Sequence, residues 1–242
     1  MPISTRARGL LVILMWLVWL MWGLLTGACA AAPRTRIERP DQLPANSYRV
    51  PPDVGRLVVD AAAFAEVSRQ VRAALEDELR RYDIRDITAL EDRLFVLSLL
   101  DALDGRWVEA VGRLDAIAAV ETDPRAKAMT GLTIRVWADA RAHGGASAPH
   151  FRAALERKLA ELPVTEVRPQ LVMLRAMGQT FTPEVCRKLI EDSIGEEARS
   201  GALSLESIHA LAFQRYAVVN LVPVGHEIDE ALAAAGVSVD EP

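Results

Sequence analysis

The four histidines are the residues of this sequence best suited to metal or acid–base chemistry, and their spacing argues against a metal site. His226-Glu227 begins the His-Glu-x-x-His pattern, in which two histidines one helical turn apart bind zinc, but Glu230 replaces the second histidine. His143 and His150 flank a Gly-Gly-Ala-Ser-Ala-Pro loop that supplies no cysteine or acidic ligand. The sequence therefore predicts no metal and no metal-dependent reaction.

Nucleophilic catalysis is also not expected. His209 follows Ser207 by two residues on a predicted helix, where side chains two positions apart point in different directions. The Gly-x-Ser-x-Gly elbow, the phosphate-binding Gly-x-x-x-x-Gly-Lys loop and the dinucleotide fingerprint are missing from the sequence. We therefore expect a protein that is not an enzyme and has no cofactor. The alternative is a hydrolase whose site is assembled from distant residues such as Glu206, His209 and His226.

Acidic residues gather around one predicted helix and the turn after it: Glu91, Asp92, Asp101 and Asp104. Calcium-binding loops need oxygen ligands at a tighter and alternating spacing. We expect these acids to form a solvated helix face and turn rather than a cation site.

Helices are the elements that must position all of these residues. From Leu57 onward, apolar residues recur every three or four positions, which predicts amphipathic helices. Asp123-Pro124 and Thr182-Pro183 predict helix starts, and Thr88 with Glu91 predicts a capping box. The expected fold class is all-α, with antiparallel helical hairpins in an irregular α-solenoid or bundle.

One predicted hairpin carries a more specific pattern. Gly105 stands in the turn, and the next helix carries an aromatic, a small residue and a leucine at Trp107, Ala110 and Leu114, after Leu97-Ser98 on the first helix. This spacing, over residues 91–124, resembles a tetratricopeptide-type hairpin, although Asp101 stands where an aromatic residue is usual. The resemblance implies that glycine makes the turn and alanine permits close packing of the two helices.

A longer block, from Leu103 to Gly131, resembles an uncharacterised helical region of secreted bacterial proteins, in some of them ahead of a subtilisin-like protease domain. The chain ends at Pro242, with no room for such a domain after the block. The resemblance implies at most an accessory module, which is a further alternative if the protease is encoded separately.

The N-terminus has the order of an export signal. Arg6 and Arg8 precede the uncharged run Gly9–Leu25, and small residues follow up to Ala32. Cys29 in Leu-Thr-Gly-Ala-Cys resembles the lipidation site of bacterial lipoproteins, with Thr26 where leucine is usual. Lipidation at Cys29, simple cleavage and an uncleaved anchor remain open. All three place the rest of the chain outside the cytoplasm, either attached to the membrane on the periplasmic side or secreted.

The predicted organisation is a signal or anchor over 1–28, a Pro-rich tether over 29–56, a helical domain over 57–236 and a tail over 237–242. A net charge of −5 argues against a nucleic-acid partner, because binding to phosphates usually needs a basic face. Once Cys29 is lipidated or removed, Cys186 has no intramolecular partner, so we expect a buried thiol.

Together these features predict a non-catalytic, exported helical scaffold, a lipoprotein that contacts another protein at the bacterial cell envelope. Trp137 and Tyr216 are the expected partner contacts, and Trp107 is expected in the core. Membrane attachment is expected through a lipid on Cys29 or through the N-terminal anchor. The partner protein is not identified by the sequence.

Overall fold

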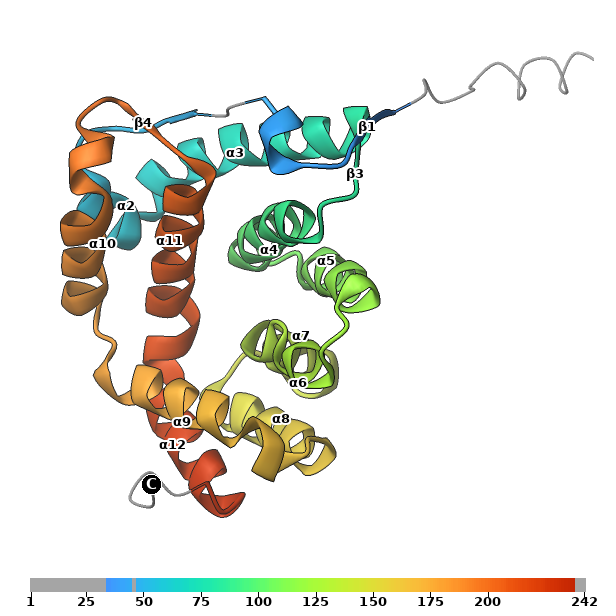
Figure 1. Cartoon of the computed structure of the whole chain (residues 1–242). Coiled ribbons are helices and arrows are strands. Elements are labelled where there is room, and N and C mark those ends of the chain that lie inside the picture. Colours follow the sequence, from blue (N-terminus) through green and yellow to red (C-terminus); the bar gives the residue numbers. More distant parts are fainter. Residues whose placement is uncertain (1–33, 45–46, 238–242) are drawn as a thin grey trace, which may run out of the picture. The chain divides into compact units, whose positions relative to one another are not determined.

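The computed structural model describes residues 34–44 and 47–237, and this part of the chain is all-α, as predicted (Figure 1). The chain divides into two units, Met1–Thr35 and Arg36–Pro242, and apart from Thr35, the first residue of β1, the features below belong to the second. Among the described residues, we find no helix that has both the length and the apolar character needed to cross a bilayer. Gly9–Leu25 and Cys29 lie outside the described residues, so the predictions on them stay predictions.

Helices follow one another with short connections along the second unit. They are α2 (Val54–Val59), α3 (Ala61–Arg81), α4 (Ile87–Leu103), α5 (Trp107–Val120), α6 (Pro124–Met129), α7 (Leu132–His143), α8 (Ala148–Glu161), α9 (Val164–Thr180), α10 (Pro183–Ala198), α11 (Leu205–Tyr216) and α12 (Gly225–Ala234). Three shorter helical turns are η1 (Pro40–Gln42), η2 (Ala217–Leu221) and η3 (Val222–Val224). The strands are β1 (Thr35–Ile37), β2 (Tyr48–Arg49), β3 (Tyr82–Ile84) and β4 (Ala202–Leu203), paired as β1 with β3 and β2 with β4.

Side-chain caps fix several helix starts. The Asp123 carboxylate accepts from Arg125 N at 3.0 Å, and the Thr182 hydroxyl accepts from Val185 N at 3.2 Å, which confirms both predicted starts. The start of α4 differs from the prediction. Asp86, not Thr88, is the N-cap, because its carboxylate already accepts from Ala89 N at 2.8 Å and places Thr88 inside the first turn.

The Pro-rich stretch before α2 differs from the extended tether that we expected. Tyr48 is only 2% exposed and Val50 is also buried, and both belong to the hydrophobic core. Tyr48 pairs with Leu203 across the antiparallel β2–β4 ladder. A single tyrosine and valine between prolines have no detectable period, so only the tertiary contacts reveal that residues 47–56 belong to the folded unit.

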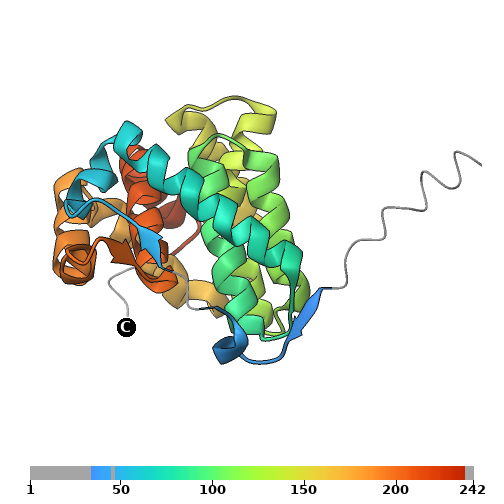
Figure 2. The same cartoon turned by 90° about the horizontal axis from the view of Figure 1, so that it is seen from above.

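The helices pack against neighbours in space, some of which are far apart in the sequence (Figures 1 and 2). α4 packs against α5 and against α11, while α2 packs against α10 and α11. Further along the chain, α7 packs against α5 and α8, and α12 packs against α8 and α9. The side chains between them form one continuous core, in which Cys186 is buried as expected.

The turn between α4 and α5 shows why this sequence folds into a tight hairpin. Gly105 has φ +75°, a left-handed conformation that favours glycine. Ala110 is fully buried where the two helices meet, and the Ser98 hydroxyl donates to Ala110 O at 3.0 Å. Small residues at this contact bring α5 close to α4, while Val108 on α5 remains 85% exposed.

Candidate binding groove

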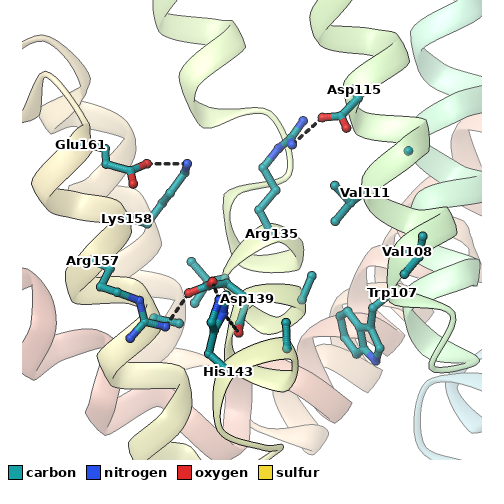
Figure 3. A pocket seen from close by; sticks show the side chains of 15 residues that line it. Trp107, Val108, Val111, Asp115, Arg135, Asp139, His143, Arg157, Lys158 and Glu161 are labelled. Carbon is teal, nitrogen blue, oxygen red and sulfur yellow. Dashed lines mark hydrogen bonds and ion pairs between the residues drawn. The ribbon is translucent and has the colours of Figure 1, made fainter.

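An open groove of about 1010 Å³ lies between α5, α7 and α8 (Figure 3). Its side on α5 carries Val108, Val111 and Gly112, and its side on α8 carries Arg157, Lys158 and Glu161. The floor comes from α7 and includes the small residues Ala138 and Ala142. We call this feature the α5–α7–α8 groove.

The α5 side of the groove is an exposed apolar helix face. Val108 is 85% exposed, and Val111 follows three positions later on the same face. The opposite face of α5, with Ala110 and Leu114, is fully buried against its neighbours. Single exposed valines are ordinary on protein surfaces, but here they line a concavity, which is where ligands and partners bind.

Charged residues of the groove pair with one another. Arg135 Nη1 donates to Asp115 Oδ1 at 2.7 Å, Arg157 Nη2 to Asp139 Oδ2 at 2.5 Å, and Lys158 Nζ to Glu161 Oε2 at 2.8 Å. Figure 3 shows these pairs along the groove. Exposed ion pairs of this kind contribute about 0–1 kcal/mol, so a ligand that offers equivalent charges exchanges with them at little cost.

Trp107 forms one end of the groove. Its ring packs against the core, as expected for this residue, and it also lines the groove, which the sequence did not indicate. The guanidinium carbon of Arg141 lies 4.7 Å from the centroid of the Trp107 ring, within cation–π distance. These contacts hold the indole in a fixed position beside Val108.

The two aromatic residues expected to contact a partner are buried, and that prediction is wrong. Trp137 is 5% exposed and Tyr216 is 1% exposed. Trp137 Nε1 donates to Asn220 O at 2.9 Å, and its ring lies 4.7 Å from that of Phe151. Both aromatic residues lie on helix faces that turn toward the core, a property that a single aromatic residue in the sequence does not reveal.

The residues of the alternative hydrolase site have different surroundings. His209 on α11 packs edge-on against Phe95 at 5.3 Å between ring centroids, and burial lowers its pKa against the opposing influence of Asp92 and Glu206. His226 on α12 is 77% exposed and lies 3.2 Å from Glu230. α11 packs on α4, whereas α12 packs on α8 and α9, so the two histidines belong to helices with different neighbours.

The remaining histidines make local contacts. His143 Nδ1 lies 2.7 Å from Asp139 Oδ1, and His150 Nδ1 shares a hydrogen bond of 2.8 Å with the Ser147 hydroxyl. Over residues 34–44 and 47–237, no group of three or more His, Cys, Asp or Glu side chains is placed to hold a metal ion.

Asp101 is fully buried, so the expectation of a solvated acidic face is wrong at this position. Its carboxylate accepts from Arg106 Nη2 and lies 3.4 Å from Arg72 Nε, while Arg72 also pairs with Asp104 at 2.6 Å. Burial raises the pKa of the Asp101 carboxyl, and the neighbouring guanidinium groups oppose that rise. Arg72 belongs to α3 and Arg106 is the N-cap residue of α5, while Arg113 within α5 lies 3.5 Å from the same carboxylate, so the cluster joins three helices beside the hairpin turn.

Sequence reasoning missed the groove, although α5 carries a signal for it. The helix has buried apolar residues at Ala110, Leu114 and Ile117 and further valines at Val108 and Val111 on another face. A helix that is apolar on more than one face has more apolar surface than one partner helix covers.

No family model, curated protein or solved structure matches this chain.

Proposed function

We propose that this protein is a non-catalytic helical scaffold, exported to the cell envelope, that binds a segment of another protein in the α5–α7–α8 groove. The observation that carries this proposal is the apolar face of α5 at Val108, which is 85% exposed, and Val111, which is half-buried, because this face lines a concavity of the size that binds ligands. Burial of this face by a partner releases water from apolar surface, which drives association.

The groove supports binding better than catalysis. Each acid that lines it, Asp115, Asp139 and Glu161, is already in an ion pair with a neighbouring base. A carboxylate that is already paired with a cation is a poor general base, because the cation competes with the proton that the carboxylate would have to accept. The groove therefore supplies a shaped surface with charges at its edge, as protein interfaces do.

The envelope location rests on the sequence. Arg6, Arg8 and the uncharged run Gly9–Leu25 support export, and Cys29 supports attachment through a lipid. Membrane attachment would keep the helical unit near partners on the same surface and raise its effective concentration there.

Site-specific photo-cross-linking tests the proposal. A photoreactive amino acid replaces Val108 in the groove or, as a control, Met173, which is 61% exposed on α9. We expect the probe at position 108 to capture one reproducible protein from intact cells, identified by mass spectrometry, and the probe at position 173 to capture none of it. Equal capture at both positions, or none at position 108, contradicts the proposed function.

A further inference from the structure

We infer that a second site, separate from the α5–α7–α8 groove, binds an arginine side chain of a partner polypeptide. The site is an open pocket of about 370 Å³, formed by α4, α6, α11 and the C-terminal end of α5. We call it the α4–α6–α11 pocket, and its walls carry Glu91, Phe95, Glu121, Met129 and His209. None of the described residues that line this pocket also lines the groove, so the two sites can be tested independently.

The lining of the α4–α6–α11 pocket has an excess of negative charge. Three carboxylates line it, from Glu91 and Asp92 near the start of α4 and from Glu121 at the C-cap of α5. Of the described residues that line the pocket, none is a lysine or an arginine. Within the described part of the chain Glu91 and Asp92 form no ion pair, and Glu121 Oε1 accepts from the backbone N of Asp123 at 2.8 Å. This lining therefore favours a cation, unlike the groove, where each acid is paired with a base.

His209 does not supply the missing positive charge. Burial lowers the pKa of its imidazole, and the opposing influence of Asp92 and Glu206 is smaller, so the ring is neutral at pH 7. Burial also raises the pKa of the Glu91 carboxyl, and the nearby charges of Glu121 and Asp92 raise it further. The acids of the pocket thus repel one another, and a bound cation would relieve that repulsion.

One carboxylate oxygen of the pocket lacks a hydrogen-bond donor. Glu91 Oε1 is buried and accepts no hydrogen bond from the residues that the structure describes. A buried acceptor without a donor costs free energy, and a ligand that donates an N–H to it removes this cost. The ligand is therefore a cation that also donates hydrogen bonds.

The rest of the lining indicates an organic cation. The rings of Phe95 and His209 lie edge to face, with 5.3 Å between their centroids, and Ile117 and Met129 add apolar surface. Among the described residues, the acids of the pocket are not grouped as ligands of a metal ion. Aromatic and aliphatic walls instead suit a cation that is carried on an apolar stem.

A guanidinium group fits this combination better than an ammonium group. Its planar fork donates to carboxylates in pairs and also stacks on aromatic rings, whereas an ammonium is a compact and strongly hydrated charge. The pocket is open, so an arginine side chain can enter while its backbone stays outside. A free small cation is bound best where the protein encloses most of its surface.

The probe is the short peptide acetyl-Gly-Arg-Gly-amide. Two matched peptides carry lysine or citrulline in place of arginine, and citrulline keeps the shape of arginine without its charge. Methyl NMR of the full-length chain follows binding through Ile117 and Met129 in the pocket, with Met173 on exposed α9 surface as the control. We expect the arginine peptide to shift both pocket methyl signals and to bind about tenfold more tightly than the citrulline peptide, with the lysine peptide between them.

Variants assign the binding to the carboxylates. Glu91→Gln/Glu121→Gln keeps the shape of the lining and removes two charges, so it should weaken binding of the arginine peptide about tenfold or more. Glu184→Gln/Glu196→Gln removes the same charge from exposed positions on α10 and should leave binding unchanged. Thermal melting verifies that each double variant is folded.

Equal binding of the arginine and citrulline peptides, tighter binding of the lysine peptide, or unshifted signals of Ile117 and Met129 would overturn the inference. Equal loss in the two double variants would overturn it as well, because the attraction would then come from the net charge of the chain. Methylguanidinium is the last probe. If it binds as tightly as the arginine peptide, the pocket holds a free small cation and not a side chain of a partner.

Discussion

The indole Nε1 of Trp137 donates to the backbone oxygen of Asn220 at 2.9 Å, and this bond joins residues 83 positions apart. It connects α7, the floor of the groove, to the η2 turn that follows α11. Because both groups are buried, the bond fixes α7 against a distant part of the chain. The position of the groove floor thus depends on a contact that no local sequence pattern encodes.

We predict that Trp137→Phe destabilises the folded state by about 1–3 kcal/mol, because it leaves the buried oxygen of Asn220 without its donor. The free energy of unfolding from urea titration measures the effect. Trp107→Phe is the matched control, since Trp107 is only partly buried at the edge of the groove, and its loss should be smaller. An equal loss for both variants contradicts this account of α7.

Gly112 on α5 and Gly131 at the start of α7 should respond to alanine in opposite directions. Gly131 has φ +61°, and a Cβ atom there would lie 2.2 Å from a methyl carbon of Leu114, so Gly131→Ala should destabilise the fold by about 1–3 kcal/mol. Gly112 lies inside α5 with open space around it, so Gly112→Ala should stabilise by about 0.5–1 kcal/mol. Thermal melting distinguishes the two, and a stabilised Gly131→Ala variant would refute the packing of α7 on α5.

His209 should make the stability of the fold depend on pH. Burial lowers its pKa below the ordinary value of 6.5, so the unfolded chain binds a proton more readily than the folded chain. The contribution of the neutral His209 side chain to the free energy of unfolding is complete above pH 6.5. It is lost as the pH falls from there through the lowered pKa of the folded state.

Urea titrations over a range of pH values test this expectation. The His209→Gln variant should lose less stability on acidification than the unmodified chain. His226→Gln, which changes an exposed histidine on α12, should follow the unmodified chain. An identical pH slope for all three proteins would contradict this account, in which partial burial of His209 lowers its pKa.

The mature N-terminus tests the export part of the proposal. We expect mass spectrometry of the protein from membrane fractions to find a lipid-modified Cys29 as the first residue. Cys29→Ser should abolish the modification, while Cys186→Ser should retain it because that thiol is buried in the folded unit. An intact Met1 would instead establish an uncleaved anchor, and an unmodified N-terminus beyond Cys29 would establish simple cleavage.

The helices were predictable because their apolar residues recur at a regular spacing that any window of the sequence reveals. Asp123-Pro124 and Thr182-Pro183 predicted helix starts through another local signal, because a capping side chain and the backbone amide that it accepts from lie only a few residues apart. Local signals of this kind do not depend on the tertiary arrangement.

The burial of individual polar and aromatic residues was not predictable in this way. In the sequence Asp101 resembles a solvated acid, but in the structure α3 brings Arg72 and α5 brings Arg113 to its carboxylate. From the sequence we expected Trp137 to be a surface contact, but in the structure its buried indole N–H donates a hydrogen bond to Asn220 O. The groove itself arises from three helices, so its sides become visible only when α5, α7 and α8 are placed together.

The central claim is that the apolar side of the α5–α7–α8 groove holds the partner, and the Val108→Asp variant tests it most directly. Because Val108 is 85% exposed, this change should leave the free energy of unfolding within about 0.5 kcal/mol of the unmodified value. Quantitative chemical cross-linking in intact cells should show that the complex with the partner falls about tenfold or more with Val108→Asp and stays unchanged with Met173→Asp. An undiminished complex with a folded Val108→Asp variant would contradict the account.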